Sequence, residues 1–237
     1  MLDIINVMSM KGINIDTNKI YLTKVMAPLC LLSICMSIKK SNPGGIIKSL
    51  YNKVVNMIKK GDSVSNIALE IVNFINNNAS LCKLTYKEFE DALGDKNVPQ
   101  GIKKGLLILD VILRSTSSSI IVDNINLEHI YPQKPHSDWA LNGWPSNHDE
   151  QMDLILNIGN FLLLNEEINK KIKNKYITLK VYYYNQIIPN DLSLQTPINT
   201  VDFSKFENDK KKYIIERQKA IATMIKNTFP IAQVLIN

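Results

Sequence analysis

The sequence predicts an α+β protein that is mostly α-helical. Two observations lead to this prediction: apolar residues recur at helical spacing through most of residues 41–114, and short runs of extended character appear only after residue 114. The chain has 237 residues, which is enough for one good core or two small ones. We therefore expect a helical region over residues 1–110, with a scaffold or docking role, and a second domain over residues 111–237 that ends in a helix.

The most apolar stretch, residues 25–38, is predicted to be a core helix. It is too short to span a bilayer, and it contains Pro28. The next helix should begin at residues 41–43 (Ser-Asn-Pro), because proline suits the first helical position. A further helix should begin near residues 62–63 (Asp-Ser), where apolar residues at helical spacing follow as far as Ile75.

Two more helices complete the first region. Thr85 and Glu88 have the spacing of a capping box, in which each side chain accepts a hydrogen bond from the backbone N–H of the other residue. Gly94 suits the end of that helix. An amphipathic run over about residues 100–114 predicts the last helix of the region.

Extended and irregular segments follow residue 114. Residues 120–122 and 125–130 look like strands, and residues 158–164 give a further short strand. Residues 131–153 contain three prolines and two tryptophans without a clear period, which predicts a long irregular insertion.

Helical signals return at the end of the last strand. Asn165 is a favoured N-cap, and the two glutamates after it suit the positive end of a helix dipole. A polar connector is expected over residues 190–204. Residues 207–228 predict a terminal amphipathic helix.

Charge and cysteine usage limit the class of protein. The chain has 28 Lys+Arg against 22 Asp+Glu, a net charge of +6, and a pI near 9.0. This excess favours a polyanionic partner, although the general bias toward Lys, Asn and Ile would also arise from an AT-rich coding sequence. Cys30, Cys35 and Cys82 form no CxxC pair, so we expect reduced, buried thiols in a cytoplasmic protein. Residues 1–18 lack the layout of a signal peptide, and no membrane association is expected.

Two segments hold the residues that could carry out chemistry. Residues 127–133 read LEHIYPQ, and residues 158–169 read IGNFLLLNEEIN. Glu128 and His129 should lie where a strand ends, because Pro132 cannot continue a ladder. Asn160 opens the next strand. Asn169 lies in the first turn of a Lys-rich helix, and its side chain should point back toward that strand.

These residue types suit the hydrolysis of a phosphodiester. A histidine with an ordinary pKa of about 6.5 can accept the proton of an attacking water at neutral pH. A carboxylate and an amide oxygen are ligands that Mg²⁺ prefers, with Mn²⁺ as an alternative. The order of parts predicts a ββα-metal (HNH) nuclease module in which His129 is the general base and Glu128 and Asn169 hold the metal. Asn160 would stabilise the loop of the active site. With two protein ligands, the metal should bind weakly without substrate.

The run EHIYPQ…IGNFLLL…IN…NK…LK, within about residues 110–230, resembles the C-terminal HNH-type (His-Me finger) nuclease domain of GmrSD-type, modification-dependent restriction endonucleases. The resemblance implies metal-dependent nicking or cleavage of DNA in a restriction system that acts against phage. It also implies the same roles for the four residues named above. The matching positions are Glu128, His129, Gly159, Asn160, Asn169 and Lys180, with Glu216 and Arg217 in the terminal helix.

One departure from that family concerns partners. Its longer proteins carry a nucleotide-hydrolysing domain with an Asp-Gly-Gln-Gln-Arg box, and no such box occurs here. The chain is therefore expected to be the effector half of a two-chain system or a C-terminal portion. A separate nucleotide-hydrolysing or modification-sensing subunit is the expected partner besides DNA.

Several side chains have two open interpretations. Lys173, Lys175 and Lys180 could contact DNA phosphates, or they could be solvated lysines on an exposed helix. Trp139 and Trp144 could stack on a base, or they could pack within the insertion. At the level of the whole protein, the alternatives to a DNase are a non-catalytic DNA-binding or docking subunit that retains an HNH framework, and an RNase.

Overall fold

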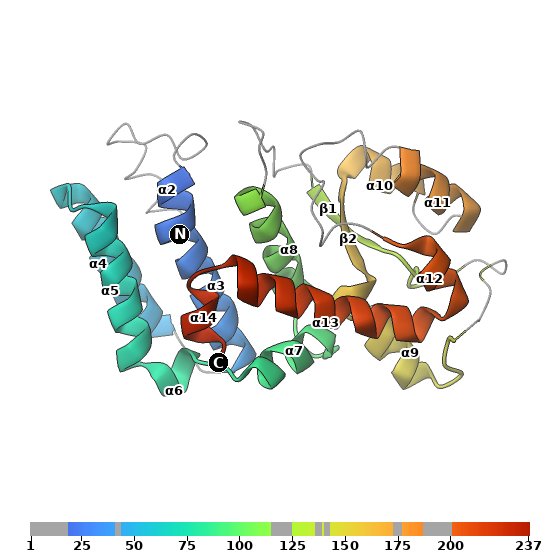
Figure 1. Ribbon diagram of the computed structural model, residues 1–237, viewed down its shortest axis with the longest axis horizontal. Helices are drawn as coiled ribbons and strands as arrows, with labels where there is room; N and C mark the ends of the chain where they lie inside the picture. Colours follow the sequence, from blue (N-terminus) through green and yellow to red (C-terminus); the bar gives the residue numbers. More distant parts are fainter. Residues whose placement is uncertain are drawn as a thin grey trace. The chain divides into compact units, whose positions relative to one another are not determined.

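The computed structural model describes residues 19–40, 44–114, 125–135, 139, 143–172, 177–186 and 201–237, which are mostly helical and include a two-stranded antiparallel sheet (Figure 1). The predicted α+β, mostly α-helical class is confirmed. In chain order, the elements are α2 (Lys19–Tyr21), η1 (Leu22–Met26), α3 (Ala27–Ile38), α4 (Gly44–Lys60), α5 (Val64–Asn77), α6 (Ala79–Cys82), α7 (Tyr86–Gly94), α8 (Gln100–Arg114), β1 (Ile125–His129), α9 (His148–Ile155), η3 (Ile158–Asn160), β2 (Phe161–Asn165), α10 (Glu166–Ile172), α11 (Ile177–Gln186), α12 (Phe203–Asn208), α13 (Lys210–Thr228) and α14 (Ala232–Leu235).

The chain divides into two compact units. The first comprises Met1–Phe89 and Ile225–Asn237, and the second comprises Glu90–Met224. This division differs from the predicted domains in two places. Helix α8 groups with the second unit, in which it packs on β2, and α14 groups with the first unit, in which it contacts α3 and α5.

The helices of the first unit follow the predicted pattern. Helix α3 is buried along most of its length, as expected for the most apolar stretch of the chain, and a π-helical turn, η1, precedes it. Helices α4 and α5 pack against one another. The Thr85 hydroxyl accepts a hydrogen bond from the Glu88 backbone N–H at 3.1 Å, and Glu88 accepts one from the Thr85 N–H at 2.7 Å, which confirms the capping box. Helix α7 ends at Gly94, as predicted.

The N-cap of α5 allows a test of how much a capping hydrogen bond contributes to the free energy of unfolding. Ser63 has extended backbone angles, and its hydroxyl accepts a hydrogen bond from the Asn66 N–H at 3.2 Å. Replacing Ser63 with alanine removes this acceptor and should lower the free energy of unfolding by about 1 kcal/mol. The measurement is urea denaturation followed by circular dichroism. Ser65→Ala, an exposed position inside the same helix, is the control and should cost less; equal losses from the two variants would argue against a capping role.

The second unit contains the strand pair. Strands β1 and β2 are antiparallel, with Glu128 opposite Leu162 and His129 opposite Phe161. The predicted pairing is confirmed, with one correction. Asn160 belongs to the turn η3 rather than to the strand, which begins at Phe161. The side chain of Asn157 forms this turn by accepting a hydrogen bond from the Gly159 N–H at 2.7 Å.

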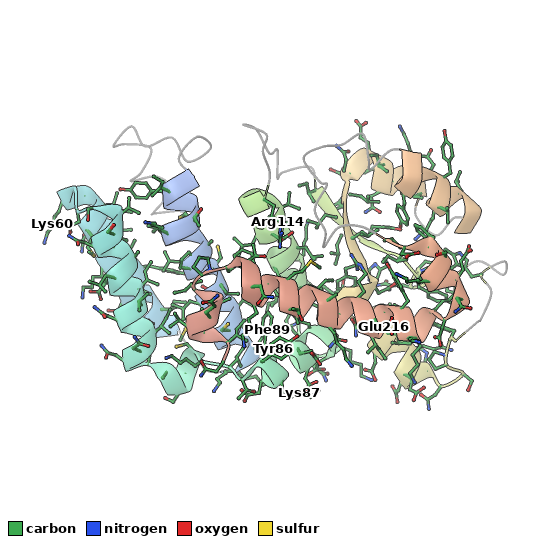
Figure 2. The ribbon with its side chains drawn as sticks, in the orientation of Figure 1. Lys60, Tyr86, Lys87, Phe89, Arg114 and Glu216 are labelled. Carbon is green, nitrogen blue, oxygen red and sulfur yellow. The ribbon has the colours of Figure 1, made fainter. Side chains whose placement is uncertain are left out.

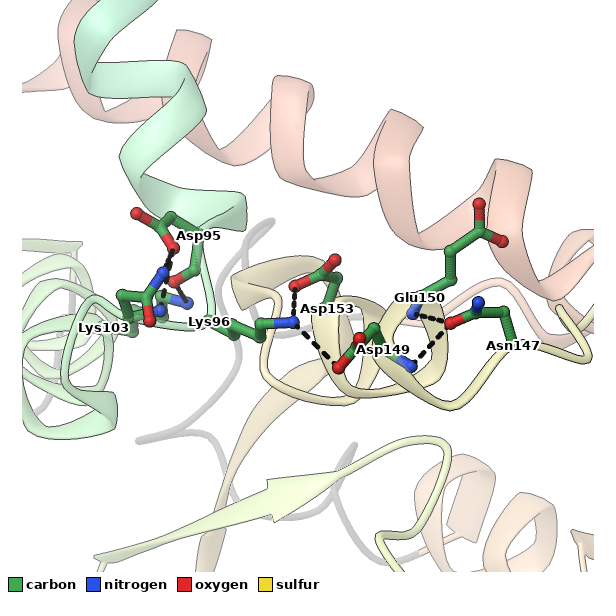
Figure 3. A network of polar contacts seen from close by, with 8 residues as sticks. Asp95, Lys96, Lys103, Asn147, Asp149, Glu150 and Asp153 are labelled. Atoms are coloured by element: carbon green, nitrogen blue, oxygen red, sulfur yellow. Dashed lines mark hydrogen bonds and ion pairs between the residues drawn. The ribbon is translucent and has the colours of Figure 1, made fainter.

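The predicted irregular insertion over residues 131–153 is wrong for its last residues, because α9 begins at His148. Asn147 caps this helix by accepting hydrogen bonds from the N–H groups of Asp149 and Glu150, at 2.8 and 3.3 Å (Figure 3). Two carboxylates in the first turn also suit the positive end of the helix dipole. These signals were present in the sequence.

The terminal helix also differs from the prediction. It divides at Asp209, whose backbone is extended and whose carboxylate accepts a hydrogen bond from the Lys212 N–H at 3.0 Å, so that α12 ends and α13 begins there. In α12 and α13, aromatic side chains reach the core that covers β2. No helix in the described part of the chain has the length and apolarity needed to cross a lipid bilayer.

Candidate active site

One pocket of the second unit brings together four of the residues that the sequence singled out, Glu128, His129, Asn169 and Lys180. It has a volume of about 310 Å³ and is formed by the end of β1, the loop that follows it, α10 and α11. Helix α10 contacts both strands, and α11 contacts α10 (Figure 1). The lining residues are Leu127, Glu128, His129, Pro132, Gln133, Lys134, Asn169 and Lys180.

The end of β1 allows two neighbouring residues to line the same pocket. Adjacent residues on a regular strand face opposite sides of the sheet. The strand ends at His129, and Pro132 follows three residues later, so Glu128 and His129 both border the pocket. The His129 ring packs edge-on against Phe161, with 4.9 Å between ring centroids.

Glu128 is buried, and its Oε1 atom has two polar partners. The Lys180 ammonium forms an ion pair with its Oε1 atom, and the Tyr184 hydroxyl donates a hydrogen bond to the same atom at 2.9 Å. Burial raises the pKa of the Glu128 carboxyl, and the charge of Lys180 opposes this effect. Burial lowers the pKa of Lys180, and Glu128 opposes that effect in turn. The site therefore contains a buried carboxylate with an internal counter-ion.

His129 is unprotonated at neutral pH. Its partial burial, and then the positive charge of Lys180, lower its pKa to about 4, so the imidazole is unprotonated at pH 7. The Nε2 atom of His129 lies 3.2 Å from the Nε2 atom of Gln133. Gln133 is exposed and is the last residue of the motif LEHIYPQ. The motif alone did not indicate that Gln133 contacts His129.

Asn169 reaches the pocket from α10. Asn165 caps this helix, as predicted, by accepting a hydrogen bond from the Glu167 N–H at 2.9 Å. Asn169 lies one turn further along and lines the same pocket as Glu128. Among the described residues there is no group of three or more His, Cys, Asp or Glu that could hold a metal. A metal here would rely on one carboxylate and one amide oxygen, a donor set that suits Mg²⁺ when water and phosphate fill the remaining positions.

Asn160 lies beneath the loop that follows His129. Its side chain is fully buried, and its Oδ1 atom accepts a hydrogen bond from the Tyr131 N–H at 2.8 Å. The Nδ2 atom donates to the carbonyls of Tyr131 and Ile155, each at 3.0 Å. The Ile130 N–H also donates to the Asn160 carbonyl, at 2.8 Å. Asn160 thus fixes the two residues after His129 without lining the pocket.

Arg217 supports the turn that contains Asn160. Its guanidinium is buried and donates to the carbonyls of Gly159 and Phe161, both at 2.8 Å. Burial lowers the pKa of Arg217 to about 10, which leaves it charged at neutral pH. The turn also passes close to α13: a Cβ atom on Gly159 would lie 2.0 Å from the Ile214 carbonyl oxygen, so glycine is required there.

A second buried cation, Lys103 on α8, holds the chain at Leu156, just before the turn that contains Asn160. Its ammonium donates to the carbonyl of Asp95 (Figure 3). It also donates to the carbonyl of Leu156, at the C-terminus of α9. Burial lowers the pKa of Lys103 to about 8. Lys96 pairs with Asp149 and Asp153 on the exposed side of α9 (Figure 3). Sequence analysis did not identify Lys103 or Lys96.

The predicted DNA-contacting lysines have different outcomes. Lys173 and Lys175 lie outside the described residues. Lys180 is only 1% exposed and donates to the His129 carbonyl at 2.7 Å, besides its pair with Glu128, so the interpretation as an exposed phosphate contact is corrected to that of a charge partner inside the site. Lys134, which was not predicted, is exposed at the rim of the pocket.

The two tryptophans favour the packing interpretation. Trp139 is 3% exposed and packs edge-on against Tyr131, at 5.3 Å between ring centroids. Trp144 stacks on the same tyrosine, at 3.7 Å. Both rings therefore stabilise the loop after His129.

A comparison with known protein families identifies a match for most of the chain. The family model described as "GmrSD restriction endonucleases, C-terminal domain" matches residues 62–224. The motifs that carry the resemblance lie within about residues 110–230, whereas the family model also matches the chain before residue 110. The additional part includes helices α7 and α8. No curated protein matches the chain, and no solved structure does.

Proposed function

The chain belongs to the family of GmrSD restriction endonuclease C-terminal domains, and from this membership and the pocket at the end of β1 we propose that it is a metal-dependent DNA endonuclease or nickase of a restriction system that acts against phage. Membership implies a nuclease role and a DNA substrate. The metal, the residue roles and the cytoplasmic location are parts of the proposal.

A single observation carries the proposal. Glu128, His129 and Asn169 are separated by up to about 40 positions in the chain, yet they line one pocket. Phosphodiester hydrolysis needs a group that accepts the proton of water and a cation that neutralises charge on the phosphate. The pocket offers an unprotonated imidazole for the first task and two oxygen donors for the second.

Each residue then has one role. His129 accepts the proton of the attacking water. Glu128 and Asn169 would hold Mg²⁺ or Mn²⁺, which supplies Lewis-acid stabilisation of the phosphate and the leaving oxygen when it is bound. Asn160 keeps the loop after His129 in place through its hydrogen bonds with Tyr131. Together with α10, the two strands would form the ββα-metal module.

Positive charge near the pocket supports DNA as the substrate. Lys134 lies at the rim, and Lys170 and Lys171 are exposed on α10. We include Lys173 and Lys175, in the chain that follows, as further phosphate contacts, because neutralising the backbone dominates the affinity for DNA. The helical region over residues 1–110 is proposed to dock a separate nucleotide-hydrolysing or modification-sensing subunit.

One observation favours a second candidate. The Glu128 carboxylate is already paired with Lys180, as it would be in a non-catalytic DNA-binding subunit that retains an HNH framework only as structure. Such a subunit would shift DNA in a gel without cutting it.

The deciding experiment is a plasmid-nicking assay of the wild-type protein with MgCl₂, with MnCl₂ and with EDTA. We expect nicked product with either metal and background levels with EDTA, because the two protein ligands hold the metal weakly enough for a chelator to remove it. Parallel assays on modified DNA, unmodified DNA and RNA identify the substrate. A gel shift of DNA without nicks under any of these conditions would support the non-catalytic candidate instead.

A further inference from the structure

Lys180 is a member of the pocket wall whose position bears directly on metal binding. Its ammonium contacts Oε1 of Glu128 and donates to the His129 carbonyl at 2.7 Å. The side chains of Lys180 and Glu128 are 1% and 7% exposed, so solvent screens this pair weakly. The carboxylate that would hold a metal therefore has a resident cation beside it.

The formal charges around the pocket also oppose the binding of a metal cation on its own. Among the described residues that line it, Glu128 is the one acidic residue, whereas Lys134 and Lys180 are both basic. A divalent cation that enters this pocket alone adds charge to a site that already carries an excess of positive charge. A phosphodiester group carries a negative charge, and its arrival would offset that excess.

The Oε1 atom of Glu128 and the His129 carbonyl hold the Lys180 ammonium in place. The Tyr184 hydroxyl donates to the same Oε1 atom at 2.9 Å, so this oxygen has two donors. Lys180 is attached to α11, and its second acceptor is a backbone atom of the strand end. The ammonium is thus anchored at two points and does not need to leave when a ligand enters.

We propose that Lys180 makes metal binding depend on DNA: the free protein holds a divalent metal weakly, and a bound phosphodiester supplies the negative charge that the metal site lacks. This inference rests on the proposed function and deepens it. Linkage requires the converse, so the metal should tighten DNA binding by the same factor. The consequence is that the complete site assembles only on substrate.

The test measures binding rather than cleavage. Mn²⁺ affinity is determined from the electron paramagnetic resonance signal of the free ion, in the His129→Ala background to prevent cutting, with and without a short DNA duplex. A titration of the duplex alone provides the blank. We expect the duplex to tighten Mn²⁺ binding by about tenfold or more. Fluorescence anisotropy of the labelled duplex should show the same factor when Mn²⁺ is added.

Variants of Lys180 assign the effect to this residue. Lys180→Met should tighten Mn²⁺ binding in the absence of DNA by about tenfold and shrink the effect of the duplex, whereas Lys180→Arg keeps the charge and should behave as wild type. Lys134→Met, an exposed lysine of the same pocket, is the matched control and should change Mn²⁺ affinity less. Circular dichroism checks that each variant is folded.

The outcomes separate this inference from the proposed function. Equal Mn²⁺ affinity with and without DNA, in a protein that nicks plasmid in an EDTA-sensitive manner, overturns the inference and leaves the nuclease assignment intact. A folded Lys180→Met variant that binds Mn²⁺ no more tightly than wild type also overturns it. A wild-type protein with neither nicks nor Mn²⁺ binding would refute both. If Lys180→Met does not fold, Lys180→Gln, which removes the charge and keeps a hydrogen-bond donor, takes its place in the same measurement and should also tighten Mn²⁺ binding in the absence of DNA.

Discussion

Replacing His129 with alanine should lower the rate of Mg²⁺-dependent nicking by about 10²–10⁴-fold, which is the range that general-base catalysis contributes. His129 borders the pocket beside Glu128, and its pKa is lowered to about 4, so its imidazole is in the unprotonated form that a general base requires. The rate is measured as conversion of supercoiled plasmid to the nicked form under single-turnover conditions. The affinity for DNA should change little, because the charge of the pocket is unaltered.

The chain offers a matched control for this substitution. His148 is exposed in the first turn of α9 and does not line the pocket, so His148→Ala should nick at the wild-type rate. His129→Ala removes an edge-on ring contact with Phe161, and thermal denaturation should therefore accompany the assay. Wild-type nicking by a folded His129→Ala variant would show that the general base is another group.

The parts of the site that follow local rules could be predicted from the sequence. A proline close behind Glu128 and His129 indicated that a strand ends there, and the structure ends β1 at His129. Asn165 carried an N-cap signal, and α10 begins at the next residue. Asn169 lies one helical turn after Asn165, on a helix that contacts both strands. Glu128, His129 and Asn169 therefore line the same pocket.

Competing local signals explain the errors in the fold. Residues 158–164 are apolar in a way typical of a strand, but Asn157 forms an Asx-type turn that keeps Asn160 outside β2. Asp209 interrupts the amphipathic pattern of the terminal helix because its carboxylate caps α13. In the insertion, prolines and tryptophans without a helical period precede Asn147, whose side chain caps α9.

Buried cations could not have been predicted in the same way. Lys180, Lys103 and Arg217 lie on helices where a basic residue is ordinarily solvated, yet all three are buried. Apart from the Asp95 carbonyl, which is near Lys103 in the chain, their partners are a carboxylate and backbone carbonyls that are distant in sequence, from Glu128 to Phe161. Backbone carbonyls exist at every position, so no residue type marks where such a bond will form. Only the resemblance to a family singled out Lys180 and Arg217.

Replacing Asn160 with alanine should reduce both stability and nicking. The substitution leaves the Tyr131 N–H and two carbonyls, those of Tyr131 and Ile155, without their partner in a buried environment. Unsatisfied buried groups of this kind predict a loss of about 2–4 kcal/mol in the free energy of unfolding. The nicking rate should fall by about tenfold or more even where the variant is folded, because positioning errors remote from the chemistry can cost about 10²-fold.

Two comparisons distinguish positioning from general stability. Asn73→Ala, at an exposed site in the interior of α5, is the control and should leave both stability and nicking near wild-type values. Arg217 supports the same turn through its hydrogen bonds to the Gly159 and Phe161 carbonyls. The variant Arg217→Met should therefore lose a comparable amount of stability. Nicking is measured well below the lowest unfolding midpoint of the set. If Asn160→Ala nicks at the wild-type rate there, the residue serves only the fold, and the loop after His129 does not need its hydrogen bonds to place the imidazole.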